Sequence, residues 1–527
     1  MNELTRRQAL ELILASASAT LAACAPTGPT QTSSSSATIV TTAASTPQPG
    51  GTLRLGLPDD LSGLDGHVLS RDNYDSIWNV WDRLTAYNQQ LEPQPLLAES
   101  WDVSTDATQY KLNLRKGVSW HSGREFTSDD VKWNLQRVAD PKIAFGQFKV
   151  LNDWFPDPEL PDKNTIILKS DTPHPSVFDY FELFNIIDPV TMQSPDAASQ
   201  AVGTGPFIFK DWQPGASLTL AKNPNYWNSG VPALDGITWS LKVDPQAMVV
   251  QLESGSLDGI KAPPVNDFVR LKSDPNYQSL VHPATGAYYC VGFNCTVPPF
   301  DNANVRQAFN WAINRQRFTD QILKGVVQPF SLPWPPSSGA YEADKANHYT
   351  FDLDKAGALL KDAGVSGLET TLLLNTGLQE LIDFAPIYQA DLATIGVKLS
   401  IQVIEVAAWI SAVNSLQYNA VYASTGSYAQ LRSPTILFAS GPVWGPTQNN
   451  TGFRNDQYTA LVNQAGVETD PTKQKQIYSQ LNDLLLDQTF VTPLAPNPPR
   501  ETFRAAVKNI TYSAHEGFVY NTATIAS

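Results

Sequence analysis

The 527-residue chain has few of the residues that carry most catalytic and metal chemistry, with only three cysteines and six histidines. The histidines are isolated along the chain, at His67, His121, His174, His282, His348 and His515. This isolation gives no metal-ligand spacing. The sequence also lacks a G-x-S-x-G elbow, H-E-x-x-H, a phosphate loop ending in Gly-Lys and G-x-G-x-x-G. We therefore expect no catalytic residues, no metal and no cofactor, and a secreted hydrolase is only a weak alternative.

Disulfide bonds are not expected in the folded part of the chain. Cys290 and Cys295 lie in the run YYCVGFNC, which has the composition of a strand. Five residues of extended chain place their Cα atoms about 16 Å apart, beyond the reach of a disulfide. The sequence predicts two buried free thiols.

The chain has no excess of positive charge. Its net charge of −15 argues against nucleic acid or an anionic membrane as the main partner. With 42% hydrophobic and 17% charged residues it resembles ordinary soluble globular proteins, and its length predicts two or three domains. Its 13 Trp, 18 Tyr and 22 Phe can supply stacking surfaces for a ligand, although most aromatic residues belong to cores.

The N-terminus has the pattern of an export signal. Arg6-Arg7 precede an apolar run, residues 12–23, that is too short to span a bilayer. Leu21-Ala22-Ala23-Cys24 resembles a bacterial lipobox, in which the cysteine is acylated; a plain signal peptide with an incidental Cys24 is the alternative. The arginine pair resembles a twin-arginine signal, and general export stays open. We expect a signal over 1–23 and, over 24–49, a Ser/Thr/Pro-rich tether about 25–30 Å in end-to-end distance.

Strands and helices alternate after residue 50, which predicts an α/β or α+β chain. YKLNLR (110–115) alternates as a strand with Tyr110, Leu112 and Leu114 on one face. Further strands are expected in GGTLRLGL, TIILKS, SLTLAK and ITWSLKV. One helix is expected over NVRQAFNWAINRQRFTDQILKG (304–325), another over DLDKAGALLKDAG, and a third over KQKQIYSQLNDLLLD.

Residues 114–135, LRKGVSWHSGREFTSDDVKWNL, gather side chains that could be catalytic. Thr127 and Asp130 have the spacing of a helix capping box, and Val131, Leu135 and Val138 then repeat at helical spacing. His121 lies in a turn with no nucleophile motif nearby, and Asp129 and Asp130 suit the positive end of the helix. The stretch is therefore predicted to be scaffolding. Gly203-Thr204-Gly205-Pro206 is likewise predicted to be a tight turn, because a strand pattern rather than a helix follows it.

Several long runs resemble the bacterial extracellular solute-binding proteins of the peptide/nickel ABC-importer class, family 5. They are PLLAESWDVSTDATQYKLNLRKGVSWHSGREFTSDDVKWNLQRV, GTGPFIFKDWQPGASLTLAKNPNYW, LESGSLDGI, FNCTVPPFDNANVRQAFNWAINRQRF and, more weakly, DLDKAGALLKDAG. They follow the family's order over nearly all of the chain after Gly50. The resemblance implies a two-lobed α/β periplasmic-binding-protein fold with a hinge. It also implies an exported, lipid-anchored, non-enzymatic monomer that delivers a solute to a membrane permease. A purely structural cell-surface protein is the other alternative.

The resemblance also implies how the chain divides into lobes. The first lobe would take residues 50–85, 199–285 and 493–527. An extra small domain of that lobe would take 86–198, and the second lobe 286–492.

Recognition of the solute is where this chain departs from the family. In peptide-binding members an aspartate of the second lobe pairs with the peptide's amino group, and the matching stretch here is YASTGSYAQLRSPTILF (422–438). The aspartate position falls near Leu431, and no Asp or Glu occurs between Glu405 and Asp456. A buried ammonium without a carboxylate is strongly disfavoured. A peptide or peptide-like solute is expected from the family, with a neutral or anionic solute such as an oligosaccharide as the alternative.

Aromatic residues are the remaining candidates for contact with the solute in this region. Trp409 lies where the family tends to place a pocket tryptophan, and Arg432 would suit a carboxylate. The predicted binding residues are Trp409, Tyr422, Tyr428, Arg432 and Trp444.

Overall fold

The computed structural model describes residues 50–68, 73–140, 142–143, 148–282, 286–426, 434, 437–438, 443–514 and 517–526, together with the backbone of Pro47–Gln48. The chain from Thr46 onward forms one compact unit. The predicted signal, Cys24 and nearly all of the predicted tether lie outside the described residues. The tether's last residues differ from the prediction, because strand β1 (Pro47–Gln48) pairs with β23 (Thr524–Ala526), which also pairs with β20 (Val507–Lys508).

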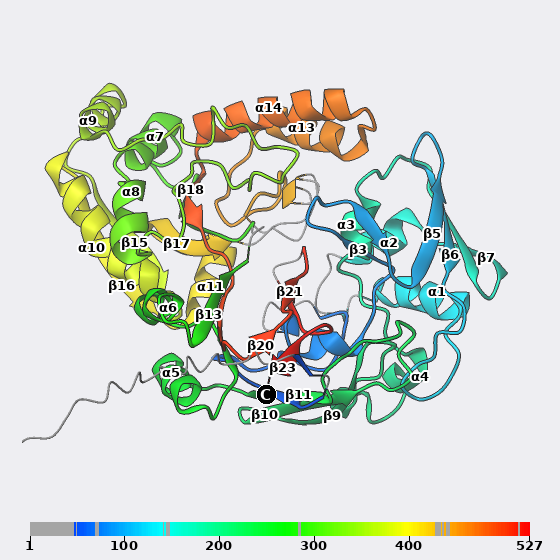
Figure 1. The fold of residues 1–527 in the computed structure, drawn as a ribbon. Coiled ribbons are helices and arrows are strands. Elements are labelled where there is room, and N and C mark those ends of the chain that lie inside the picture. Colours follow the sequence, from blue (N-terminus) through cyan, green and yellow to red (C-terminus); the bar gives the residue numbers. More distant parts are fainter. Residues whose placement is uncertain are drawn as a thin grey trace, which may run out of the picture. The chain divides into compact units, whose positions relative to one another are not determined.

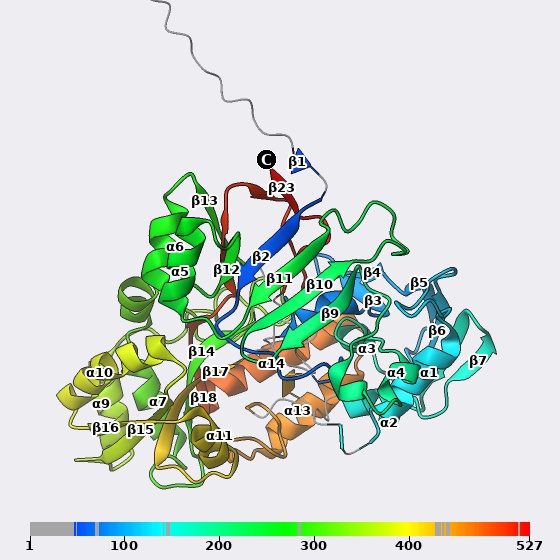
Figure 2. The same ribbon diagram turned by 90° about the horizontal axis from the view of Figure 1, so that it is seen from below.

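A seven-stranded mixed sheet is the largest element of the fold, and Figure 2 shows several of its strands side by side. Strand β2 (Thr52–Gly56) runs parallel to both of its neighbours in the sheet. In sheet order the strands are β13 (Tyr277–Val281), β19 (Arg500–Arg504), β12 (Gly259–Lys261), β2, β11 (Gly236–Ser240), β10 (Ser217–Lys222) and β9 (Phe207–Gln213). Helices α5 (Pro245–Ser254) and α6 (Val265–Lys272) pack beside β12 and β13.

A five-stranded mixed sheet is built from residues 288–496, which lie in the sequence between β13 and β19 of the seven-stranded sheet. Its order is β16 (Lys398–Ile404), β15 (Glu369–Asn375), β17 (Ala420–Gly426), β14 (Tyr288–Phe293) and β18 (Val491–Pro496). The helices around it are α7 (Ala303–Trp311), α8 (Arg315–Arg317), η5 (Phe318–Ile322), α9 (Leu353–Asp362), α10 (Gln379–Thr394), α11 (Val406–Asn414), α13 (Asp456–Val467) and α14 (Pro471–Gln488). Helices α13 and α14 pack side by side (Figure 1).

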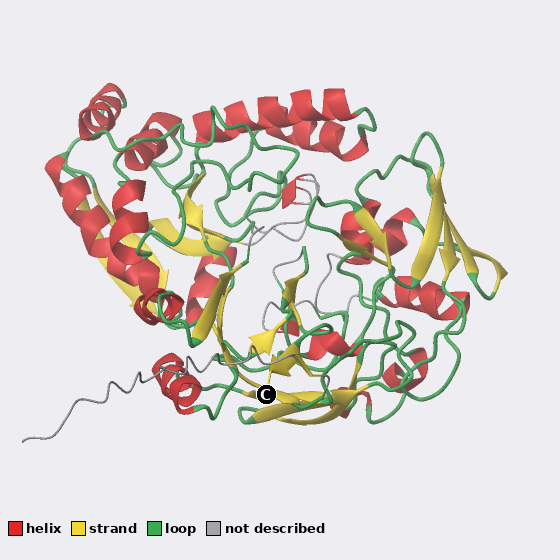
Figure 3. Ribbon diagram, viewed as in Figure 1, coloured by secondary structure: helices red, strands yellow, loops and turns green. Residues whose placement is uncertain are grey.

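A four-stranded antiparallel sheet lies within residues 98–169, with strands in yellow in Figure 3. Its order is β5 (Ala98–Val103), β6 (Gln109–Leu114), β8 (Thr165–Lys169) and β7 (Glu159–Asp162). The helices in the same part of the chain are α1 (Ser128–Arg137), α2 (Lys149–Trp154), α3 (Val177–Phe181), α4 (Pro189–Met192) and η4 (Ala197–Ser199). Strand β3 (Thr85–Tyr87) pairs with β4 (Pro93–Pro95), which contacts β5. Helix η2 (Ile77–Val80) contacts β9, and β21 (Thr511–Tyr512) pairs with β22 (Phe518–Val519) in a separate small sheet. One apolar core joins this sheet to the seven-stranded sheet, and a separate core fills the five-stranded one.

The chain passes twice between the seven-stranded and five-stranded sheets, and the two crossing segments are hydrogen-bonded to each other. The His282 N–H donates to the Pro499 carbonyl at 3.0 Å, and the Asn497 N–H donates to the Ala287 carbonyl at 2.8 Å. Beside them, Arg500 Nη2 lies 3.1 Å from Glu380 Oε1 in the first turn of α10. Two adjacent crossings with few residues each are the arrangement in which hinge motion is concentrated.

Most of the predicted elements are confirmed. Tyr110, Leu112 and Leu114 are all buried on one face of β6, and α1 buries Val131 and Leu135. The single helix predicted over 304–325 is wrong, because α7 ends at Trp311 and Asn314 caps a new short helix by accepting from the Arg317 N–H. An asparagine at this point offers the backbone a cap in place of continuing the helix.

The two cysteines are free thiols, as predicted. The position of Cys295 differs from the prediction, because β14 ends at Phe293 and Cys295 lies half-buried in the turn beyond the strand. Burial raises the pKa of the Cys290 thiol to about 12 and that of Cys295 to about 11. Both side chains are therefore neutral and unreactive near neutral pH.

Candidate binding site

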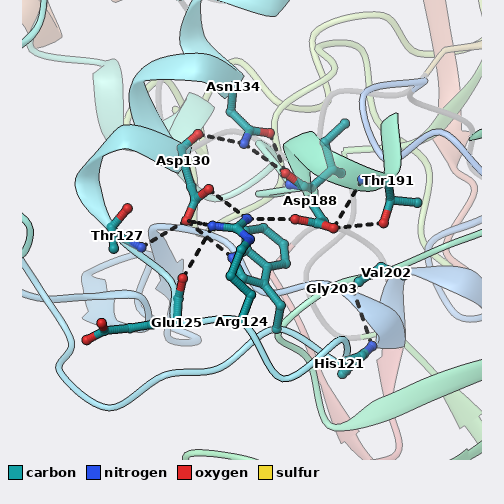
Figure 4. A network of polar contacts seen from close by, with 12 residues as sticks. His121, Arg124, Glu125, Thr127, Asp130, Asn134, Asp188, Thr191, Val202 and Gly203 are labelled. Carbon is teal, nitrogen blue, oxygen red and sulfur yellow. Dashed lines mark hydrogen bonds and ion pairs between the residues drawn. The ribbon is translucent and has the colours of Figure 1, made fainter. Parts of the chain in front are cut away.

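The stretch that gathers catalytic residue types is structural, as Figure 4 shows. The Thr127 N–H donates to Asp130 Oδ2 at 2.9 Å, which completes the predicted capping box of α1. Arg124 Nη2 lies 2.8 Å from Asp130 and 2.6 Å from Asp188, and both carboxylates are almost fully buried. Asp188 in turn caps α4 by accepting from the Thr191 N–H. These acids hold helix ends and an arginine, so they are not placed for acid–base catalysis.

His121 is fixed by the glycine-rich turn. Its Nε2 lies 2.9 Å from the Gly205 carbonyl, and its Nδ1 accepts from the Gly203 N–H at 3.3 Å. Burial lowers the pKa of His121 to about 4, so the ring is neutral at pH 7 and both of its nitrogens are engaged. A Cβ on Gly203 would lie 2.0 Å from the Val80 carbonyl oxygen. The turn is therefore a close-packing element, as predicted.

The structure brings two of the predicted binding residues together on the five-stranded sheet. Trp409 of α11 and Tyr422 of β17 have ring centroids 5.8 Å apart, at 73° between planes, in a small cluster with Leu373, Val413 and Tyr418. Trp409 is 8% exposed, and its buried Nε1–H has no hydrogen-bond partner among the described residues. A buried donor left without an acceptor is costly. Contact of Trp409 with a solute stays a prediction.

Tyr422 and Trp444 are packed inside the protein. Tyr422 lies against Gly292, where a Cβ would come within 2.2 Å of the tyrosine ring, and its hydroxyl donates to Asn450 Oδ1 at 3.1 Å. Trp444 is 1% exposed and belongs to the main core, where its Nε1 donates to Tyr288 Oη at 2.7 Å. Their contact with a solute stays a prediction. Tyr428 and Arg432 lie outside the described residues.

A cavity of about 270 Å³ lies beside the crossing segments, and the sequence reasoning did not find it. Its lining residues are Asn88, Gln89, Gln90, Leu91, His282, Pro336, Ser337, Tyr512, Ser513 and Ala514. They come from four separate parts of the chain, and no Asp, Glu, Lys or Arg is among them. At this size it could hold one group of a solute, because sites for whole drug-sized ligands are about 300–1,000 Å³. No local sequence pattern joins segments so far apart.

A buried cluster of charged residues involves strands β12 and β19. Glu501 of β19 pairs across the sheet with Lys261 of β12, and both Glu501 oxygens lie within 3.3 Å of Tyr520 Oη. Lys261 Nζ is 2.6 Å from Asp75. Burial, and then the charge of Asp75, raises the pKa of Glu501 well above its ordinary value. Glu501 is therefore a carboxyl that the fold favours in its protonated, neutral form.

Replacing Glu501 with glutamine is expected to stabilise the protein above pH 5. The folded state holds Glu501 protonated, whereas the unfolded chain ionises it near pH 4.3. As the pH rises from about 4.3 towards the raised pKa of Glu501 in the folded state, the free energy of unfolding of the wild type therefore falls by about 1.4 kcal/mol per pH unit. Glutamine mimics the neutral carboxyl and removes this loss. Unfolding midpoints of both proteins at pH 4 and pH 8 measure the effect, and an equal difference at the two pH values would contradict it.

The fold is that of the periplasmic binding proteins. The periplasmic binding protein DppA from Helicobacter pylori, solved in complex with the peptide STSA, superposes with a TM-score of 0.80 over 91% of this chain and 99% of its own, at 23% identity. The predicted two-lobed α/β fold is confirmed by this match. Among the described residues, no helix is long and apolar enough to cross a membrane, and no group of three or more His, Cys, Asp or Glu side chains could hold a metal ion.

The chain belongs to the bacterial extracellular solute-binding proteins, family 5, whose model matches residues 92–481. It is 29% identical to heme-binding protein A of Haemophilus influenzae, over 79% of this chain and 81% of that protein. It is also 29% identical to di/tripeptide-binding protein 1 of Pseudomonas aeruginosa, over 82% of this chain and 86% of that protein. Both relatives are binding proteins, which fits the expectation of a non-enzymatic chain.

Proposed function

We propose that this protein is the lipid-anchored solute receptor of an ABC importer. It captures its solute by closure of the two lobes about the hinge and delivers it to a membrane permease. The observation that carries the proposal is the pair of hydrogen-bonded crossing segments between two separate sheets, in a chain of this family. Such a hinge lets a solute select the closed arrangement. Cys24 and the tether would hold the receptor at the outer face of the membrane or in the periplasm.

The lobe boundaries form part of the proposal. We infer a first lobe from 50–85, 199–285 and the C-terminal segment, an extra domain from 86–198, and a second lobe from 286 onward. Because β18 continues to Pro496 within the five-stranded sheet, we place the second crossing after Pro496 rather than at 492.

The proposed solute is a peptide or a peptide-like compound. Two relatives are named for heme and for di- and tripeptides, which supports a solute about the size of a short peptide. The absence of any Asp or Glu between Glu405 and Asp456 favours solutes without a free amino group, such as blocked peptides or oligosaccharides, as the second candidate. The unused Trp409 N–H suits an acceptor oxygen, which both kinds of solute carry.

A thermal-shift screen with short peptides, amino-blocked peptides and oligosaccharides tests this assignment. A solute at about 100 times its dissociation constant should stabilise the protein by about 2.7 kcal/mol. Stabilisation by peptides with free amino groups would mean that another acid binds the ammonium. Stabilisation only by sugars or blocked solutes would support the second candidate. A protein that responds to none of these solutes would contradict the proposed function.

Replacing Trp409 with phenylalanine is expected to have opposite effects on stability and on solute binding. The variant removes a buried donor that has no partner in the described part of the chain, so the ligand-free protein should keep its stability or gain up to about 1 kcal/mol. A solute that accepts from Nε1 should bind about tenfold more weakly. Calorimetric titration with the best solute of the screen, and unfolding without it, measure the two effects.

Trp444→Phe is the matched comparison, because it removes an indole N–H that already has an acceptor in Tyr288. It should lower stability by about 1–3 kcal/mol. Unchanged affinity would assign Trp444 to the core, whereas weaker binding would favour the predicted contact with solute. If Trp409→Phe leaves affinity unchanged, its indole N–H does not bind the solute.

A further inference from the structure

One arginine beside the five-stranded sheet has no carboxylate partner among the residues that the structure describes. Arg315 is 4% exposed, and its guanidinium donates to the carbonyls of Pro493, Asn310 and Tyr349 and to Asn310 Oδ1. None of these partners is a carboxylate. Burial lowers the pKa of Arg315 to about 10, and the nearby Tyr349 and Tyr388 act in the opposite direction. A buried charge is ordinarily paired, so this arginine favours an anion close by.

A cavity of about 370 Å³ opens beside Arg315 on the surface of the protein. Its other lining residues are Asn314, Gln316, Gln328, Pro329, Asn347, Tyr349, Thr350 and Phe351. No Asp or Glu is among them. The wall is thus made of carboxamide side chains, a hydroxyl, a proline and two aromatic rings, together with Arg315. None of these residues lines the cavity at the crossing segments.

Asn314 lines the cavity and caps α8 through its side-chain oxygen. Its Oδ1 accepts from the Arg317 N–H at 2.9 Å, which leaves the amide hydrogens available. Gln316 differs, because its Nε2 donates to Asp320 at 2.9 Å and the amide is thereby engaged. Gln328, Asn347 and Thr350 are exposed at the rim. Amide and hydroxyl donors of this kind can bind the oxygens of an anion without adding charge.

Charges of both signs lie near the cavity. The Arg317 guanidinium lies 5.6 Å from the ring centroid of Phe351 but is paired with Asp391 at 3.1 Å. Asp320 accepts from Gln316 of the wall, and Asp352, beside Phe351, caps α9. Arg315 differs from Arg317 in having no carboxylate partner among the described residues.

We propose that the cavity lined by Arg315, Asn314, Gln328 and Asn347 binds a small anion through a carboxylate or phosphate group. This site is separate from the proposed solute site and does not depend on the proposed function. The anion would lie beside the buried guanidinium and accept from the amide donors of the wall. It would neutralise Arg315. Because the Arg315 guanidinium donates to the Pro493 carbonyl, the anion would also stabilise the contact between α8 and β18.

Titration of the purified protein with sodium phosphate and with sodium citrate tests the proposal, with sodium chloride of equal ionic strength as the reference. Saturable stabilisation beyond that of chloride is expected. A response to phosphate alone assigns a phosphate group, and a response to citrate alone assigns a carboxylate. Shifts no larger than those of chloride for both anions would overturn the proposal.

Gln328→Glu locates the site, because it places a carboxylate on the cavity wall. It should raise the unfolding midpoint without added anion and weaken anion binding at least tenfold. Asn347→Asp provides the same test at a second position. Gln402→Glu, on the exposed side of β16, makes the same change of charge elsewhere and should leave the anion response intact. An equal response in Gln328→Glu and the wild type would show that the anion binds at another place.

Discussion

Replacing Arg124 with methionine is expected to destabilise the protein by about 3–5 kcal/mol. Arg124 neutralises both Asp130 and Asp188, whose side chains are 5% and 2% exposed. Methionine keeps much of the side chain's volume but leaves two buried carboxylates without a cation. Each acid also caps a helix, α1 or α4, so repulsion between them weakens two helix starts together. Equilibrium unfolding in urea measures the loss.

Lys163→Met is the control for this prediction. Lys163 pairs with Glu125 at 2.7 Å, but the two side chains are 60% and 50% exposed. Its loss should cost no more than about 1 kcal/mol, because water solvates the remaining charge. If both variants lose the same small amount, the Arg124 network is solvated rather than buried, and its role as the support of the two helices would be wrong.

Replacing Gly203 with alanine is expected to cost about 3 kcal/mol or more. The added Cβ would lie 2.0 Å from the Val80 carbonyl oxygen and 2.7 Å from the Trp81 ring. A backbone oxygen cannot move aside as the end of a flexible side chain can, so the turn and the segment before β3 must separate. That movement would also break the contacts of His121 with Gly203 and Gly205. Thermal and urea unfolding should both register the loss.

Gly466→Ala makes the same change at an open position. Gly466 lies in α13 with nothing within 4 Å of its added Cβ. Alanine there should stabilise the protein by up to about 1 kcal/mol, through helix propensity and a less flexible unfolded chain. A Gly203→Ala protein as stable as the wild type would show that the turn relaxes, and that the close packing of Gly203 is not required.

The elements that could be predicted from sequence are those set by neighbouring residues. The capping box of Thr127 and Asp130 and the alternation of Tyr110, Leu112 and Leu114 depend on spacings of two to four residues, and the structure has both. The division of the 304–325 helix could not be predicted in this way. Its apolar spacing continues past Trp311, and the competing cap at Asn314 is a local alternative that periodicity does not weigh.

The candidate sites depend on contacts between distant residues, which spacing does not reveal. The cavity at the crossing segments is lined by residues as far apart in sequence as Asn88 and Tyr512. The cavity beside Arg315 is likewise lined by separate segments, and none of its lining residues is acidic. Burial likewise could not be predicted for single aromatic residues. Trp409 lies in the run VAAWISAV and Trp444 in GPVWGPT, and neither run shows that, among the described residues, the Trp444 indole N–H has an acceptor and that of Trp409 has none.

A solute is expected to close the two lobes about the paired crossing segments. Small-angle X-ray scattering of the purified protein, with and without the solute that gives the largest thermal shift, measures this closure. The radius of gyration should fall on saturation and follow the same titration curve as the thermal shift. An unchanged radius at saturating solute would show binding without closure, and would contradict the account of this protein as a hinged solute receptor.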